Sequence, residues 1–154
     1  MKFSRRSVLI LPAALGLAAT TDIQSRLIGV GPAKAEETFI SYGPFKGARD
    51  GIWGDGTATI LKLDDGSYRL DLSDNFSVRP GPDLEVVLVK TDNVTSAKDI
   101  MENDYISISQ LEKSDGAQSY KLPTGLDPNE YGSVVIYCEE YTVLFSSASR
   151  NPGS

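Results

Sequence analysis

Short runs rich in β-branched and aromatic residues recur along this chain, and Gly, Pro, Asn and Asp separate them. No long stretch after residue 35 repeats its apolar residues at the 3.6-residue period of a helix. Runs of this length, bounded by turn-forming residues, are typical of β-strands. About seven of them lie in residues 36–149, the length of one ordinary domain. We therefore predict a single all-β domain, an antiparallel β-sandwich, with a small β-barrel as the alternative.

The clearest hairpin signal is a pair of runs at 57–64 and 67–72, joined by Asp65-Gly66. Asp-Gly suits a two-residue type I′ turn, in which both central residues have positive φ. That turn would pair Leu61 with Leu70 and put apolar side chains on one face and charged ones on the other. We therefore predict a half-buried antiparallel hairpin.

The remaining strands are predicted at 84–90, 105–109, 118–122, 133–138 and 141–146. The run 84–90 is nearly continuously apolar, which favours an interior strand. A tight connection at Glu139-Glu140 would pair Cys138 with Tyr141, but Glu-Glu is poor chemistry for a type I′ turn. A bulge or a longer turn is the alternative, and either would change the side on which Cys138 lies. Residues 97–101 are expected to form one helical turn, and residues 150–154 a disordered tail.

The first 35 residues differ in charge from the rest of the chain. They carry a net charge of +4, whereas residues 36–154 hold ten basic and twenty acidic residues, a net charge of −10. Their basic start precedes an apolar run at 8–19 and the small-residue sequence Ala33-Lys34-Ala35. This order is typical of an export signal, and the run is shorter than the roughly 20 residues that span a bilayer. We predict that residues 1–35 are a signal peptide, removed after Ala35.

The sequence Ser4-Arg5-Arg6-Ser7-Val8-Leu9 resembles the twin-arginine export motif, which directs folded proteins across a membrane. Val8 stands where Phe is usual. The mature protein is therefore expected outside the cytoplasm, periplasmic or secreted, with no membrane span. Its negative charge argues against binding to nucleic acid or to an anionic membrane surface. The sequence identifies neither the protein partner nor the oligomeric state.

Composition excludes several kinds of chemistry. The chain has no histidine, and Cys138 is its only cysteine. These counts exclude Ser-His and Cys-His catalytic pairs, histidine-held metals and haem, intrachain disulfides, CxxC pairs and iron–sulfur clusters. No catalytic constellation is readable, so an enzyme is not predicted. No cofactor is predicted either, with a haem held by Cys138 or Met101 left as an alternative.

Two interpretations of Cys138 compete. It is either a redox-active thiol or a small buried hydrophobe on the apolar run 134–138. Reactive thiols lie beside cations, whereas Glu139 and Glu140 follow this one directly, and negative charge disfavours a thiolate. The residues alone favour packing. The glycine-rich segment 51–56 is interpreted as a turn, with Trp53 either in the core or covering one end of it.

A family resemblance adds to this interpretation. The residues that carry it are Gly56-Thr57-Ala58-Thr59-Ile60, Leu70-Asp71-Leu72, Gly81-Pro82-Asp83-Leu84, Gly116-Ala117-Gln118-Ser119-Tyr120 and Ser133-Val134-Val135-Ile136-Tyr137-Cys138. In this order and spacing they resemble the DM-thirteen domain, described as an electron-transfer module that occurs alone in exported bacterial proteins. The resemblance covers about 39–149 and implies a β-sandwich with one redox-active cysteine, here Cys138. Tyr137 stands where Trp often precedes that cysteine.

Two functional hypotheses follow. The first is an exported redox or electron-transfer accessory domain that acts through Cys138, as the resemblance implies. The second is a non-catalytic binding or adhesion module in which Cys138 is core packing. Burial of Cys138 and the polar groups beside it are the observations that separate the two.

Overall fold

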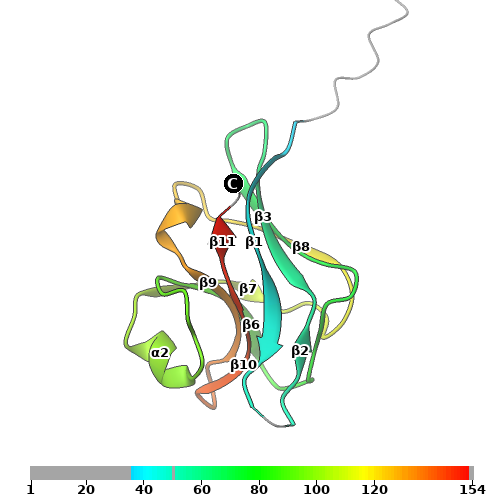
Figure 1. The fold of residues 1–154 in the computed structure, drawn as a ribbon, viewed down its shortest axis with the longest axis vertical. Coiled ribbons are helices and arrows are strands. Elements are labelled where there is room, and N and C mark those ends of the chain that lie inside the picture. The colour runs from blue at the N-terminus through cyan, green and yellow to red at the C-terminus, as the bar shows by residue number, and fades with distance from the viewer. Residues whose placement is uncertain (1–35, 50, 153–154) are drawn as a thin grey trace, which may run out of the picture. The chain divides into compact units, whose positions relative to one another are not determined.

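The computed structural model describes residues 36–49 and 51–152 of the chain (Figure 1). The predicted signal peptide, with its twin-arginine motif and its Ala33-Lys34-Ala35 sequence, lies outside the described residues. Within the described ranges, no helix is both long enough and apolar enough to cross a membrane.

The regular secondary structure of the described residues is almost entirely β-strand. The strands are β1 (Thr38–Gly47), β2 (Gly54–Asp55), β3 (Thr57–Lys62), β4 (Tyr68–Leu72), β5 (Ser77–Val78), β6 (Leu84–Val89), β7 (Tyr105–Gln110), β8 (Gln118–Lys121), β9 (Ser133–Cys138), β10 (Val143–Ser149) and β11 (Asn151–Pro152). Two short helical elements, α2 (Ala97–Met101) and the 3-10 turn η1 (Pro128–Glu130), complete the list. The predicted helical turn at 97–101 is confirmed.

One antiparallel sheet dominates, with strand order β7-β6-β9-β10-β1-β3-β4-β8 and with β11 added on β1. β2 and β5 pair separately. The two strands at the ends of this order, β7 and β8, contact each other, so the sheet is nearly closed on itself. The predicted fold class, all-β with sandwich or barrel character, is confirmed.

Strand β1 joins the two halves of the sheet. Its residues 38–44 pair with β3, and its residues 45–47 pair with β10. A side chain at Gly43 would collide with the carbonyl oxygen of Ser149. Strands β1 and β10 can approach this closely because glycine has no side chain. The strand prediction omitted β1, because glycines and a proline interrupt its apolar residues.

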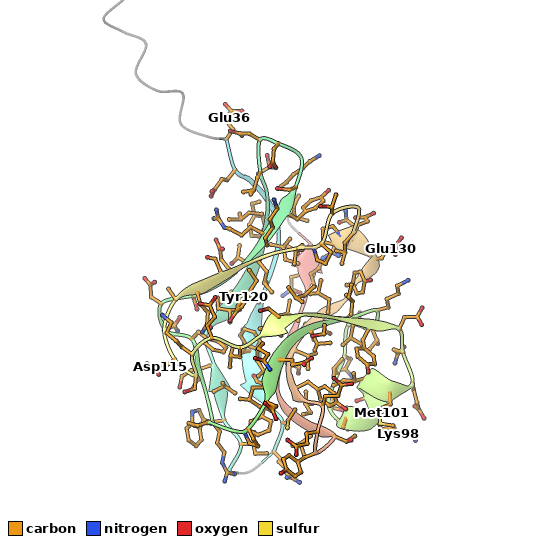
Figure 2. All side chains as sticks on the ribbon, turned by 180° about the vertical axis from the view of Figure 1, so that it is seen from behind. Glu36, Lys98, Met101, Asp115, Tyr120 and Glu130 are labelled. Atoms are coloured by element: carbon orange, nitrogen blue, oxygen red, sulfur yellow. The ribbon has the colours of Figure 1, made fainter. Side chains whose placement is uncertain are left out.

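Two apolar clusters hold the sheet together. The larger has members on β1, β3, β4, β6, β8, β9 and β10 and so draws on both halves of the sheet, whose side chains Figure 2 shows on the ribbon. The smaller lies on the other face of β6, β9 and β10, beneath α2, and consists of Val87, Val89, Val94, Ile100, Val135, Tyr137 and Leu144. Strands β6 and β9 are therefore buried on both faces, which explains their continuous apolar runs and confirms β6 as an interior strand.

The predicted hairpin exists, but its predicted register is wrong by one residue. Leu70 pairs with Ile60 and not with Leu61. The amide of Gly66 donates to the carbonyl of Leu63 at 2.9 Å, so the turn contains three residues and has positive φ at Gly66 alone. A one-residue shift exchanges the two faces of a strand. Ile60 and Leu70 are therefore the buried residues, at 2% and 0% exposure.

The hairpin between β9 and β10 follows the alternative that the sequence left open. Cys138 pairs with Val143, so the connection spans residues 139–142. The register also shifts between Leu144 and Ser146, as in a β-bulge. A longer turn and a bulge are both present, and the tight pairing of Cys138 with Tyr141 is not formed.

Two smaller expectations differ from the structure. Trp53 is not in the core, which was one of its two expected positions: it is 49% exposed and donates from Nε1 to Oγ of Ser77 at 3.3 Å. Its neighbour Ile52, at 5% exposure, occupies the core. Strand β11 lies within the segment expected to be disordered, and it pairs Asn151 with Tyr42 of β1.

Candidate functional site

The candidate site is built around Cys138 at the end of β9. Its backbone pairs with Leu84 of β6 on one side and with Val143 of β10 on the other. The side chain is 1% exposed and belongs to the larger apolar cluster. Its Sγ lies 3.1 Å from the carbonyl oxygen of Pro82, to which the thiol donates a hydrogen bond. The thiol is thus a packed core group with one specific polar contact.

That contact reaches a surface turn, residues 80–83, which leads into β6. Pro82 is exposed, although the thiol hydrogen-bonded to it is buried. Asp83 has a φ of 44°, a left-handed conformation that a residue with a side chain rarely adopts. A Cβ added to Gly81 would lie 2.6 Å from Cζ of Phe145, so this turn packs directly against the core. The buried Cys138 side chain is therefore in direct contact with an exposed residue, Pro82.

Of the carboxylates near Cys138, two are exposed and a third is hydrogen-bonded to another residue. Glu139 and Glu140, which directly follow the thiol in sequence, are both exposed. Glu85, paired with Tyr137 across β6 and β9, accepts a hydrogen bond from Ser107 at 2.6 Å. Burial raises the pKa of the Tyr137 hydroxyl. The hydrogen-bond partner of the Cys138 thiol is the neutral carbonyl of Pro82, which accepts a hydrogen bond from it.

A shallow groove of about 230 Å³ runs beside the turn. Its walls are residues 80, 81, 83 and 84 on one side and the segment 110–114 on the other. A buried polar network holds this loop: the Tyr120 hydroxyl donates to Oε1 of Gln118 at 2.6 Å and accepts from the amide of Glu112 at 3.1 Å. Burial raises the pKa of Tyr120.

Sequence reasoning missed this network. Gln118 and Tyr120 are two residues apart on β8, so they share one face of the strand, and a Gln among core residues was the signal available.

Whether the residues that the structure describes could hold a metal or a haem depends on their places in the fold. Among them, no group of three or more His, Cys, Asp or Glu side chains could hold a metal ion. Met101 lies on α2 and is 65% exposed, whereas Cys138 is buried on the opposite face of the sheet. The two residues considered as alternative haem ligands therefore differ in exposure and lie on different faces of the sheet.

The chain matches the model of a known protein family. The family model described as Electron transfer DM13 matches residues 45–149. The chain belongs to this family. The match runs from the end of β1 to the end of β10, so the DM13 segment contains the turn 80–83 and Cys138. Searches among curated proteins and among solved structures find no match.

Proposed function

We propose that this DM13 domain is an exported electron-transfer accessory domain in which Cys138 is the redox thiol. The family supports the redox role. The observation that carries the role of Cys138 is its hydrogen bond to Pro82, because this bond connects a buried thiol to an exposed turn. Movement of four residues would bring the thiol to the surface without unfolding the sheet.

The proposed step is exchange with a disulfide on a partner protein. Cys138 loses its proton, and its sulfur forms a bond to one sulfur of that disulfide. The other sulfur leaves with the electron pair of the broken bond and is protonated to a thiol. Cys138 is oxidised to a mixed disulfide, and one half of the partner's disulfide is reduced. Because thiolate attack needs access, the turn controls the rate.

Ellman's reagent, itself an aromatic disulfide, tests this step directly. We expect it to titrate one thiol in the folded wild-type protein, slowly, and to leave a recoverable mixed disulfide. Gly81→Ala puts a methyl group against the ring of Phe145 and forces the turn to shift. Overpacking of this kind costs about 1–3 kcal/mol, so we expect the reaction to accelerate about tenfold. Cys138→Ala should abolish the reaction.

Ile60→Val is the matched control. Ile60 lies in the same apolar cluster but on β3, away from the turn, and this truncation costs about 0.5–1.5 kcal/mol. If the turn gates the thiol, Ile60→Val leaves the rate unchanged. If both variants accelerate the reaction only in proportion to their loss of global stability, the thiol reacts by unfolding and the proposed role fails.

A binding module with Cys138 as packing is the second candidate, and the 1% exposure of the side chain favours it. It requires that Cys138→Ala lower the free energy of unfolding, by about 1–3 kcal/mol, and leave activity in a partner assay intact. The redox proposal requires that the same variant lose that activity even where it remains folded.

Export is tested separately in cells that carry a twin-arginine pathway. We expect the full chain to be recovered outside the cytoplasm and shortened by 35 residues. Replacing Arg5 and Arg6 together with lysine keeps the charge and should retain the chain inside. Export of this double variant at the wild-type level would contradict the twin-arginine proposal.

A further inference from the structure

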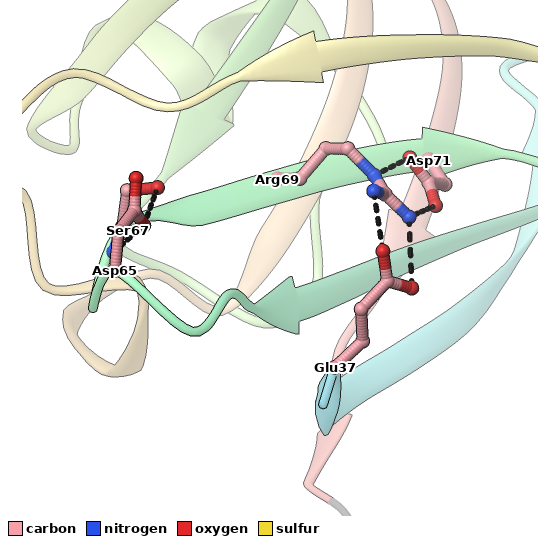
Figure 3. Close-up of polar contacts among 5 residues, drawn as sticks. All are labelled: Glu37, Asp65, Ser67, Arg69 and Asp71. Carbon is pink, nitrogen blue, oxygen red and sulfur yellow. Dashed lines mark hydrogen bonds and ion pairs between the residues drawn. The ribbon is translucent and has the colours of Figure 1, made fainter. Parts of the chain in front are cut away.

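An ion-pair cluster, which we call the Arg69 clamp, fastens the start of β1 to the sheet (Figure 3). Nη1 and Nη2 of Arg69 donate to the two carboxylate oxygens of Glu37 at 2.7 and 3.2 Å. Nε and Nη2 donate to the two oxygens of Asp71, both at 2.7 Å. One planar guanidinium thus holds two carboxylates through paired hydrogen bonds, the geometry in which arginine ion pairs are strongest.

The Asp71 half of the clamp is partly shielded from solvent. The side chains of Arg69 and Asp71 are 30% and 26% exposed, so water screens this pair incompletely, whereas Glu37, at 39%, is exposed. Burial alone would raise the pKa of Asp71, but hydrogen bonds from Arg69 and Ser119 outweigh burial and lower it. Asp71 therefore fixes the guanidinium on β4, and the guanidinium in turn fixes Glu37.

Glu37 is two residues beyond Ala35, where the sequence predicts removal of the leader. The next residue, Thr38, is already paired with Lys62 in the ladder of β1 and β3. Proteases cut exposed, poorly fastened backbone and are resisted by chain that is tied into a sheet. The bond between Ala35 and Glu36 therefore lies one residue before the bond that joins Glu36 to the clamped Glu37.

We propose that the Arg69 clamp is a processing stop, which holds Glu37 on the folded sheet so that proteolytic removal of the leader ends at Glu36 and does not advance into β1. The proposal rests on the proposed export for its biological setting. A protein carried across a membrane already folded meets its processing protease with β1 in place. The clamp then sets the boundary between the part removed and the part kept.

Limited digestion of the purified full chain with a broad-specificity protease tests the stop, with intact mass identifying the first residue of the resistant core. For the wild-type protein we expect a core that begins at residue 36 or 37. Arg69→Gln removes the clamp, and Glu37→Gln releases β1 while leaving Arg69 paired with Asp71. Both variants should give cores that begin at Thr38 or later, with amides at the start of β1 exchanging about fivefold faster.

Lys121→Gln is the matched control, because Lys121 lies opposite Arg69 on β8 and its loss changes the charge by the same amount. It should behave as the wild type. Identical cores from all four proteins would overturn the proposal, and unfolding curves at pH 7 would show that each variant is folded. The export proposal is tested separately from the processing stop. A chain that keeps its leader in cells would contradict export, and the digestion experiment would still show whether the Arg69 clamp protects β1 from proteolysis.

Discussion

Tyr120 is the residue that connects the sheet to the loop beside the candidate site. Its side chain is 4% exposed, and its hydroxyl both donates to Gln118 and accepts from the amide of Glu112. Tyr120→Phe removes both bonds and leaves a backbone donor without that partner. We expect the free energy of unfolding to fall by about 1–3 kcal/mol, measured by urea denaturation.

The control for this change is Tyr68→Phe, whose hydroxyl has no recorded hydrogen bond within the described chain and whose loss should cost little. Equal effects of the two substitutions would show that the network does not hold the loop.

The candidate thiol shows how much of the site could be predicted from the sequence. Cys138 could be singled out from the sequence, but its partner Pro82 could not, because 56 residues separate them and only the pairing of β6 with β9 brings them together.

The hairpin of β3 and β4 depends on one backbone conformation. Gly66 has a φ of 82°, and a Cβ added there would meet no atom within 4 Å. Gly66→Ala should therefore cost only the strain of a left-handed residue, about 1 kcal/mol, with no steric term. Urea denaturation measures this cost, and Asp64→Ala in the same exposed turn should be nearly neutral. A loss of several kcal/mol would mean that the turn does more than connect two strands.

This turn also shows what the sequence could not decide about the fold. Asp65-Gly66 located the hairpin correctly, but Asp-Gly fits both a two-residue turn and the three-residue turn observed, and the choice between them sets which face is buried. The missed strand β1 has a different cause. Its glycines are unfavourable for an isolated strand, yet Gly43 permits the close approach to Ser149 that joins the halves of the sheet. Both errors arise because tertiary contacts outweigh local preference.

For the whole molecule, closure of the sheet places charge on the outer surface and leaves three aspartates fixed by donors. Hydrogen bonds from Ser67 lower the pKa of Asp65, and hydrogen bonds from Thr95 and Ser96 lower that of Asp99. The pKa of Asp71 is lowered as well, because hydrogen bonds from Arg69 and Ser119 outweigh the effect of burial. All three are held as carboxylates in the folded state.

Acid stability should follow from these three groups. A carboxyl whose pKa is lowered by folding binds protons more tightly in the unfolded chain, so its contribution is complete above the unfolded pKa of about 4 and is lost as pH falls through the lower folded value. We expect the free energy of unfolding, measured in urea between pH 7 and pH 2.5, to be level above about pH 5 and to decline below about pH 4. Asp71→Asn should weaken the protein at pH 7 and make the decline shallower, because the group that takes up the proton is gone. Asp64→Asn, in an exposed turn, should leave the decline unchanged. A decline of equal depth in all three proteins would show that Asp71 of the Arg69 clamp does not contribute to acid unfolding.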